Sequence, residues 1–217
     1  MLCYVVPLAA ARECYSFIEK DELILACALI LAVVILFLVL ASMNSRRQKT
    51  LIYYAETDEL TGIFNRRAFE HKVQSWMDSE ECAGKQAFLM MDVDLFKEIN
   101  DVYGHAVGDK VLKQVGKILR ETFRGSDILG RIGGDEFAVF MKDITEKEMA
   151  ARKAEELKEK LLEIDFPELK GRKITASMGI AFFPDAGEGY KEVYICADKA
   201  LYETKRSGRN GYHIYHS

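Results

Sequence analysis

The sequence has no pair of cysteines in the Cys-x-x-Cys spacing, although five cysteines occur among its 217 residues. This excludes the common zinc and dithiol redox motifs. It has no excess of basic residues, because the formal net charge is −4 at pH 7, and a nucleic acid is therefore not expected as a partner. No Gly-x-x-x-x-Gly-Lys-Ser/Thr segment occurs, so a P-loop nucleotide site is excluded. Internal repeats and low-complexity tracts are also absent.

One long run without charge does occur, at residues 23–41, and it contains nineteen residues. As a helix that rises ~1.5 Å per residue, it would span ~30 Å, which is the thickness of the hydrocarbon core of a membrane. A buried helix is rarely apolar on every face over such a length. No basic region precedes the run, as one would in a signal peptide. The sequence therefore predicts one transmembrane helix.

The charges that flank this run predict its orientation. Residues 1–22 contain two basic and four acidic residues, whereas residues 42–56 contain three basic and one acidic residue. Because basic flanks stay on the cytoplasmic side of a membrane, the part that follows is expected in the cytoplasm. We expect four parts: a short extracytoplasmic segment 1–22, a transmembrane helix 23–41, a linker or signalling helix 42–57 and a domain 58–217.

The linker contains neither proline nor glycine, and we interpret it as a continuation of the membrane helix. Its residues Met43, Thr50, Leu51 and Tyr54 could form a narrow seam against a second copy of the chain. It could equally be a solvated connector, and both interpretations stay open.

Beyond the linker, helical and strand patterns alternate. Apolar residues at helical spacing, with a Thr-x-x-Glu capping box at 145–148, predict helices at 65–77, 106–123, 145–164 and 190–206. Short apolar runs predict strands at 87–93, 174–182 and 212–215 and a hairpin at 128–141. The order strand-helix-hairpin-helix-strand is typical of an α/β (α+β) sandwich of the ferredoxin-like palm type. A palm delivers acids on adjacent central strands to one cleft.

The segment Gly133–Phe137 reads Gly-Gly-Asp-Glu-Phe and joins two apolar runs, 128–132 and 137–141. Apolar runs joined by Gly-Gly are typical of a β-hairpin. Glycine lets the backbone approach a bulky ligand closely, and carboxylates beside the turn can hold a hard cation over phosphate oxygens. Taken alone, the segment could also be a surface hairpin with solvated acids.

A second acidic strand lies upstream, at 88–94, and ends in Asp92, Val93 and Asp94. With a period of two, Asp92 and Asp94 share one face while Val93 points to the other. Because an unpaired buried carboxylate is costly, acids at the end of a buried strand favour cation binding. The alternative is a strand that ends at the surface with solvated aspartates.

These two motifs, together with the opening segment 58–67 and the closing segment 197–210, resemble the GGDEF-domain diguanylate cyclases of bacterial signalling. The similarity extends from Asp58 to Tyr215. It implies an enzyme that condenses two GTP into cyclic di-GMP and releases two pyrophosphates, by reciprocal 3′-hydroxyl attack across a homodimer. With the predicted membrane helix, we expect the inner (cytoplasmic) membrane as its location.

Two alternatives to this enzyme stay open. One is a catalytically silent GGDEF domain that binds GTP or cyclic di-GMP and regulates a partner. The other is a related palm-fold cyclase that acts within one nucleotide, and the mass of the product made from GTP separates the two chemistries.

The resemblance assigns a divalent cation, Mg²⁺ with Mn²⁺ as an alternative, to the two acidic strands. The implied ligands are Asp92, the backbone carbonyl of Val93, Asp135 and, second in rank, Glu136. Asp135 is also the implied catalytic proton acceptor. Such a cation acts on a phosphodiester reaction as a Lewis acid and as a template.

For the nucleotide, the resemblance implies that Asn100 and Asp109 read guanine, since a carboxylate accepts two hydrogen bonds from the N1–H and N2–H₂ edge. Both residues could instead cap helices beside nearby glycines. The implied phosphate contacts are basic side chains, at Lys97, Arg131, Lys205 and Arg209.

Arg124 and Asp127 form an Arg-x-x-Asp pattern with the spacing of the family's inhibitory site. The resemblance implies that cyclic di-GMP binds there as product and inhibitor, with the planar guanidinium of Arg124 on guanine and phosphate.

Overall fold

The chain divides into two compact units, Met1–Tyr53 and Tyr54–Ser217, and each is described by itself. The computed structural model describes three single leucines and three longer ranges: Leu25, Leu29, Leu31, 33–43, 55–82 and 84–216.

In the first unit, the described residues are helical and their apolar side chains are exposed, as at Leu36 and Phe37. Among the described residues, no helix combines the length and the apolar character that a membrane crossing requires. The predicted transmembrane helix 23–41 lies in part outside the described residues, as does most of the linker 42–57 and all of the segment 1–22. The assignments of these three segments therefore stay predictions.

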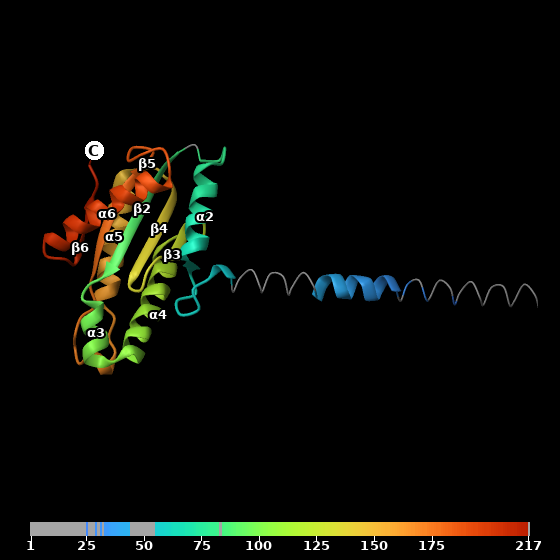
Figure 1. The fold of residues 1–217 in the computed structure, drawn as a ribbon, viewed down its shortest axis with the longest axis horizontal. Helices are drawn as coiled ribbons and strands as arrows, with labels where there is room; N and C mark the ends of the chain where they lie inside the picture. The colour runs from blue at the N-terminus through green and yellow to red at the C-terminus, as the bar shows by residue number, and fades with distance from the viewer. Residues whose placement is uncertain are drawn as a thin grey trace, which may run out of the picture. The chain divides into compact units, whose positions relative to one another are not determined.

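The second unit is built on one six-stranded sheet (Figure 1). Its strands are β1 Phe64–Asn65, β2 Lys85–Val93, β3 Ile128–Arg131, β4 Glu136–Ile144, β5 Ala176–Phe183 and β6 Gly211–Ile214. Their order across the sheet is β1-β3-β4-β2-β5-β6. The central strand β2 is antiparallel to both of its neighbours, β4 and β5. β3 and β4 form the predicted hairpin. The edge strand β1 pairs in parallel with β3, and the edge strand β6 pairs in parallel with β5.

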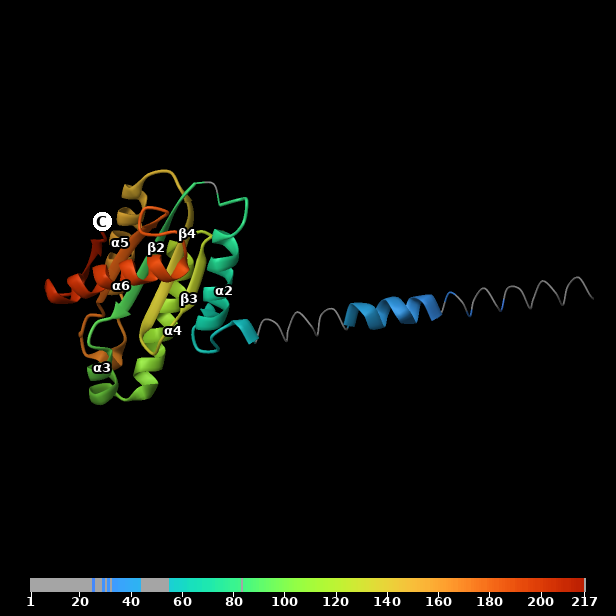
Figure 2. The same cartoon turned by 45° about the horizontal axis from the view of Figure 1, so that its top comes forward.

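Helices cover both faces of this sheet (Figure 2). They are α2 Arg66–Met77, α3 Phe96–Tyr103, α4 His105–Thr122, α5 Lys147–Leu162, α6 Tyr190–Arg206 and the 3-10 helix η1 Pro167–Leu169. α4 and α5 share one core with Leu89 and Met91, whereas α2 and α6 share the other with Phe88 and Met90. Because β2 alternates between two covered faces, it is apolar almost throughout. The predicted α/β sandwich is confirmed.

α6 lies directly against β5 at Gly179. A Cβ atom on Gly179 would lie 2.1 Å from the carbonyl oxygen of Ala197 and 2.2 Å from the amide nitrogen of Leu201, and both are backbone atoms of α6. Because real Cβ atoms do not approach backbone so closely, glycine is required for this spacing between helix and sheet.

Most predicted elements are confirmed to within a few residues, but two details differ. Residues 96–103 form α3, which is not among the predicted helices, although Phe96, Ile99 and Tyr103 lie at helical spacing along it. The predicted capping box at 145–148 is wrong. α5 begins at Lys147 and its N-cap residue makes no side-chain hydrogen bond, since β4 continues to Ile144 and delays the start of the helix.

Candidate active site

Two acidic strand ends meet at the centre of the sheet. Because β2 and β4 are antiparallel, the last residues of β2 lie beside the first residues of β4, and Asp92 pairs with Glu136 in the register. The amide of Val93 donates to the carbonyl oxygen of Asp135 across the same junction, at 3.1 Å. All four residues that the sequence predicts as cation ligands are therefore brought together here.

Two carboxylates at this junction, those of Asp92 and Glu136, have raised pKa values. Burial is the main cause of the raised pKa of Asp92, and the charges of Asp135 and Asp94 raise it further. Burial also raises the pKa of Glu136, followed by the charges of Asp92 and Asp135. Acids held together in this way favour a positive partner. In the structure that partner is Lys205, whose Nζ lies 2.9 Å from Asp92 Oδ2.

The donor atoms at the junction suit a hard divalent cation. Carboxylate and carbonyl oxygens are the ligands that Mg²⁺ and Mn²⁺ prefer. Burial and, less strongly, neighbouring acids raise the pKa values of Asp92 and Glu136, and a bound cation would favour the ionised form of both. In the described part of the chain, however, no group of three or more His, Cys, Asp or Glu side chains is arranged as a metal site. The cation ligands therefore stay a prediction.

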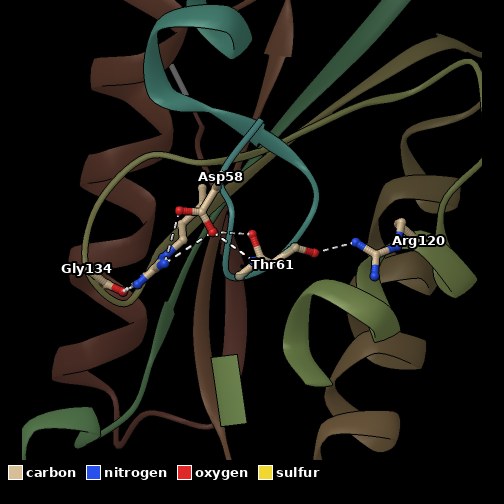
Figure 3. A network of polar contacts seen from close by, with 5 residues as sticks. Asp58, Thr61, Arg120 and Gly134 are labelled. Carbon is tan, nitrogen blue, oxygen red and sulfur yellow. Dashed lines mark hydrogen bonds and ion pairs between the residues drawn. The ribbon is translucent and has the colours of Figure 1, made fainter. Parts of the chain in front are cut away.

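The Gly-Gly turn between β3 and β4 is held by one guanidinium. Arg131 donates to the carbonyl oxygen of Gly134 from Nη2, at 2.6 Å, and from Nε, at 3.2 Å. Its Nη1 lies 3.2 Å from both carboxylate oxygens of Asp58. Figure 3 shows Asp58 and Gly134 within this network. Arg131 is thus engaged inside the chain, and its predicted contact with phosphate stays a prediction.

Asp58 also anchors the segment that enters the domain. Its Oδ1 accepts hydrogen bonds from the amide and the hydroxyl of Thr61, at 2.9 and 2.6 Å. Thr61 in turn accepts a hydrogen bond from Arg120 of α4 at its carbonyl oxygen (Figure 3). Burial raises the pKa of Asp58, but the hydrogen bonds from Thr61 and the charge of Arg131 outweigh burial and lower this pKa. The entry segment, α4 and the Gly-Gly turn therefore form one polar network.

The residues predicted to read guanine lie on α3 and α4. Asn100 lies against Gly108, because a Cβ atom on Gly108 would fall 1.9 Å from Asn100 Oδ1. Lys97 and Asp109 are exposed. Neither helix has a side-chain hydrogen bond at its N-cap. The alternative in which Asn100 and Asp109 serve as helix caps is therefore wrong.

The two C-terminal phosphate contacts predicted from the sequence lie at the end of α6. Lys205 pairs with Asp92, whereas Arg209 is exposed in the turn that follows the helix. That turn is tied to the acidic junction by the buried Asp94, which accepts a hydrogen bond from the amide of Asn210 at 3.1 Å. Sequence reasoning assigns Asp94 no partner, because no local pattern indicates a contact between residues so far apart in the chain.

Comparison with known proteins places this site in a family. Residues 55–211 match the family model described as diguanylate cyclase, GGDEF domain. The chain belongs to the GGDEF family. It is 38% identical over 162 residues to the uncharacterized protein YhcK of Bacillus subtilis, and the matched region covers 73% of this chain and 45% of YhcK. It is also 38% identical over 159 residues to the probable diguanylate cyclase DgcT of Escherichia coli, and the matched region covers 72% of this chain and 35% of DgcT. The chain thus matches less than half the length of either relative.

Solved GGDEF structures share the fold. The GGDEF domain of DgcB from Caulobacter crescentus, in complex with c-di-GMP, is 30% identical with a TM-score of 0.68, over 75% of this chain and 94% of that chain. The active GGEEF domain of a diguanylate cyclase from Vibrio cholerae is 29% identical with a TM-score of 0.65, over 70% of this chain and 97% of that chain. These similarities agree with the sheet and helices described above.

In this GGDEF domain, the Arg-x-x-Asp segment forms the turn before β3. Asp127 uses both carboxylate oxygens for backbone amides, since Oδ2 accepts from Arg124 at 2.9 Å and Oδ1 accepts from Lys142 of β4 at 3.1 Å. The side chain of Arg124 is exposed, and its Nη2 lies 3.7 Å from Met149 Sδ. Asp127 therefore shapes the turn, and the role of the pair as a product site stays a prediction.

Proposed function

We propose that this chain is a diguanylate cyclase, which condenses two GTP into cyclic di-GMP and releases two pyrophosphates. The observation that carries the proposal is the junction where Asp92 and Glu136 meet beside the ammonium of Lys205. Phosphoryl transfer needs carboxylates that can hold a metal cation and positively charged side chains that can bind phosphate, because negative charge is spread over the transferred group. Membership of the GGDEF family supports the same reaction.

In the proposed reaction, the 3′-oxygen of each GTP attacks the α-phosphorus of the other. A new P–O bond forms, the bond between the α-phosphorus and its bridging oxygen breaks, and pyrophosphate leaves with the electron pair of that bond. Asp135 accepts the proton of the 3′-hydroxyl. A divalent cation held by Asp92, Asp135, Glu136 and the carbonyl of Val93, either Mg²⁺ or Mn²⁺, would supply Lewis-acid chemistry there.

Other side chains bind and orient the nucleotide in this proposal. Asn100 and Asp109 hold guanine by its donor edge, which adenine lacks, so ATP would leave a carboxylate unpaired and be rejected. Lys97, Lys205 and Arg209 neutralise the triphosphate. Because each domain holds one GTP, two copies must face each other, and turnover per chain should fall on dilution. A rate per chain that does not depend on concentration would contradict the homodimer.

We further propose that cyclic di-GMP inhibits the enzyme at Arg124 and Asp127, and that residues 23–41 anchor it in the inner membrane. The uncharged run and the basic residues that follow it support the anchor. The protein should remain in the membrane pellet after carbonate extraction. Its release into the supernatant would contradict the anchor.

The reaction itself is tested by incubating the full chain with GTP and Mg²⁺ and weighing the products. The expected product has the mass of cyclic di-GMP, and two pyrophosphates accompany each molecule. Asp135→Asn keeps the shape of the side chain and should lower the rate about a hundredfold or more, as the loss of a proton acceptor does. A cyclic mononucleotide would indicate a cyclase that acts within one GTP. Binding of GTP without any product would indicate a silent regulator.

A further inference from the structure

Asp94 lies where three segments of the domain meet. It directly follows β2, and 6% of its surface is exposed. Its Oδ1 accepts a hydrogen bond from the hydroxyl of Ser177 at 2.6 Å, and its Oδ2 accepts from the hydroxyl of Thr175 at 2.8 Å. The same Oδ2 accepts from the amide of Asn210 at 3.1 Å. One carboxylate thus joins the end of β2 to the start of β5 and to the turn between α6 and β6.

The turn after α6 has a strained backbone. Three successive residues have positive φ angles: Gly208 at 110°, Arg209 at 63° and Asn210 at 48°. A residue other than glycine costs about 1–2 kcal/mol in this region, so the turn needs contacts that compensate. The amide of Arg209 donates to the carbonyl oxygen of Thr204 at 3.1 Å, and the amide of Asn210 donates to Asp94. Asp94 is therefore one of the groups that stabilise the turn 208–210, which contains Arg209.

We propose that Asp94 is a positioning residue for phosphate binding, which holds the turn so that Arg209 and Asp92 meet the same nucleotide. The inference rests on the proposed diguanylate cyclase function, because Arg209 is taken there as a phosphate contact. Asp94 does not touch the substrate. The length of its side chain and its hydrogen-bonding atoms carry the effect, and its charge does not.

Two substitutions separate position from charge. Asp94→Asn removes the charge but keeps the shape, since the amide oxygen accepts from Asn210 and Thr175 while the amide nitrogen donates to the hydroxyl of Ser177. Asp94→Glu keeps the charge but adds a methylene at a buried site, which displaces the carboxylate from the amide of Asn210. We expect the KM for GTP to rise about tenfold in Asp94→Glu and to stay within about threefold in Asp94→Asn, with kcat changed less than KM in both.

A double-mutant cycle tests whether the effect passes through Arg209. Arg209→Ala alone should raise the KM about tenfold, and Asp94→Glu should add little in that background, because the side chain that the turn carries is already absent. Amide hydrogen exchange at Asn210 is a readout independent of turnover, and it should be faster in Asp94→Glu and unchanged in Asp94→Asn. Thr175→Val is the control, since it removes one hydroxyl from the same oxygen and leaves the amide of Asn210 bonded.

Three outcomes would overturn the proposal. They are an unchanged KM in Asp94→Glu, a larger rise in Asp94→Asn than in Asp94→Glu, and multiplicative effects in the cycle. If Asp94→Glu lacks the circular dichroism of a folded chain, Asp94→Ser replaces it, because its short hydroxyl does not reach the amide of Asn210. If the chain makes no cyclic di-GMP, the proposed function fails, but the dissociation constant for GTP and the exchange rate at Asn210 still decide the role of Asp94.

Discussion

The ammonium of Lys205 lies 2.9 Å from Oδ2 of Asp92, so the last turn of α6 is joined by an ion pair to the end of β2. The side chain of Asp92 is 15% exposed and that of Lys205 is 34% exposed. Water therefore reaches one partner more than the other. A lysine that contacts the acidic junction in this way is also close enough to bind a phosphate oxygen that enters it.

Replacement of Lys205 should weaken GTP binding. We expect Lys205→Met to raise the KM for GTP about tenfold or more, because a hydrogen bond between charged groups contributes ~1.5–3 kcal/mol. Lys191→Met on the same helix is the matched control, since Lys191 is exposed near the opposite end of α6. Initial rates against GTP concentration check both variants. An equal KM in Lys205→Met and wild type would contradict the phosphate contact.

The Asp58 network should make stability depend on pH. The pKa of Asp58 is lowered from its ordinary value of 3.8. Its carboxylate therefore stabilises the fold above pH 3.8, and this contribution is lost as the pH falls through the lower pKa of the folded state. In urea unfolding from about pH 6 to about pH 3, Asp58→Asn should start less stable than wild type and lose less stability.

The exposed Asp165 supplies the control for this measurement. Asp165→Asn should follow the wild-type dependence of unfolding free energy on pH. A dependence in Asp58→Asn as steep as that of wild type would show that the ionised carboxylate of Asp58, which Thr61 and Arg131 contact, contributes nothing to stability.

Gly108 should be required for the pose of Asn100. In Gly108→Ala the new methyl would fall 1.9 Å from Asn100 Oδ1 and 3.2 Å from Phe96 Cζ, so Asn100 must turn away. We expect the KM for GTP to rise about tenfold, because one hydrogen bond to guanine is lost. Gly189→Ala is the control, since a Cβ there has no neighbour within 4 Å. Unchanged GTP kinetics in Gly108→Ala would show that Asn100 does not read guanine.

Arg124 should control inhibition by product and not the reaction itself. Arg124→Ala is expected to keep the initial rate while added cyclic di-GMP no longer slows it, because the guanidinium fork is lost. Asp127 is a poor target for the same test, since its carboxylate holds two backbone amides of the turn. Arg67→Ala, at an exposed arginine of α2, should remain inhibited. Progress curves with and without added product compare the variants.

The acidic junction could be predicted because its signals are local. The period of two in β2 and the Gly-Gly turn before β4 place Asp92 and Glu136 at neighbouring strand ends once the two strands pair. The two-sided burial of β2 likewise leaves a continuous apolar run that the sequence displays.

The contacts that support the junction could not be predicted, because they join residues far apart in the chain. Arg131 has a side chain that can bind phosphate, yet it donates hydrogen bonds to the carboxylate of Asp58 and to the carbonyl oxygen of Gly134. Asp94 and Asn210 meet through a backbone amide, which no side-chain pattern reveals. α3 differs from these contacts, because Phe96, Ile99 and Tyr103 recur along it at helical spacing and make it predictable, although the signal covers only eight residues.

The distance between α6 and β5 is short at Gly179, because glycine has no side chain to separate the two backbones. The carbonyl oxygen of the neighbouring Met178 accepts a hydrogen bond from the hydroxyl of Thr204, at 2.6 Å. This bond holds α6 against β5 next to the close contact at Gly179. Lys205 is the next residue on that helix. A strand that supplies no acid and no base of its own thereby determines how far the lysine reaches.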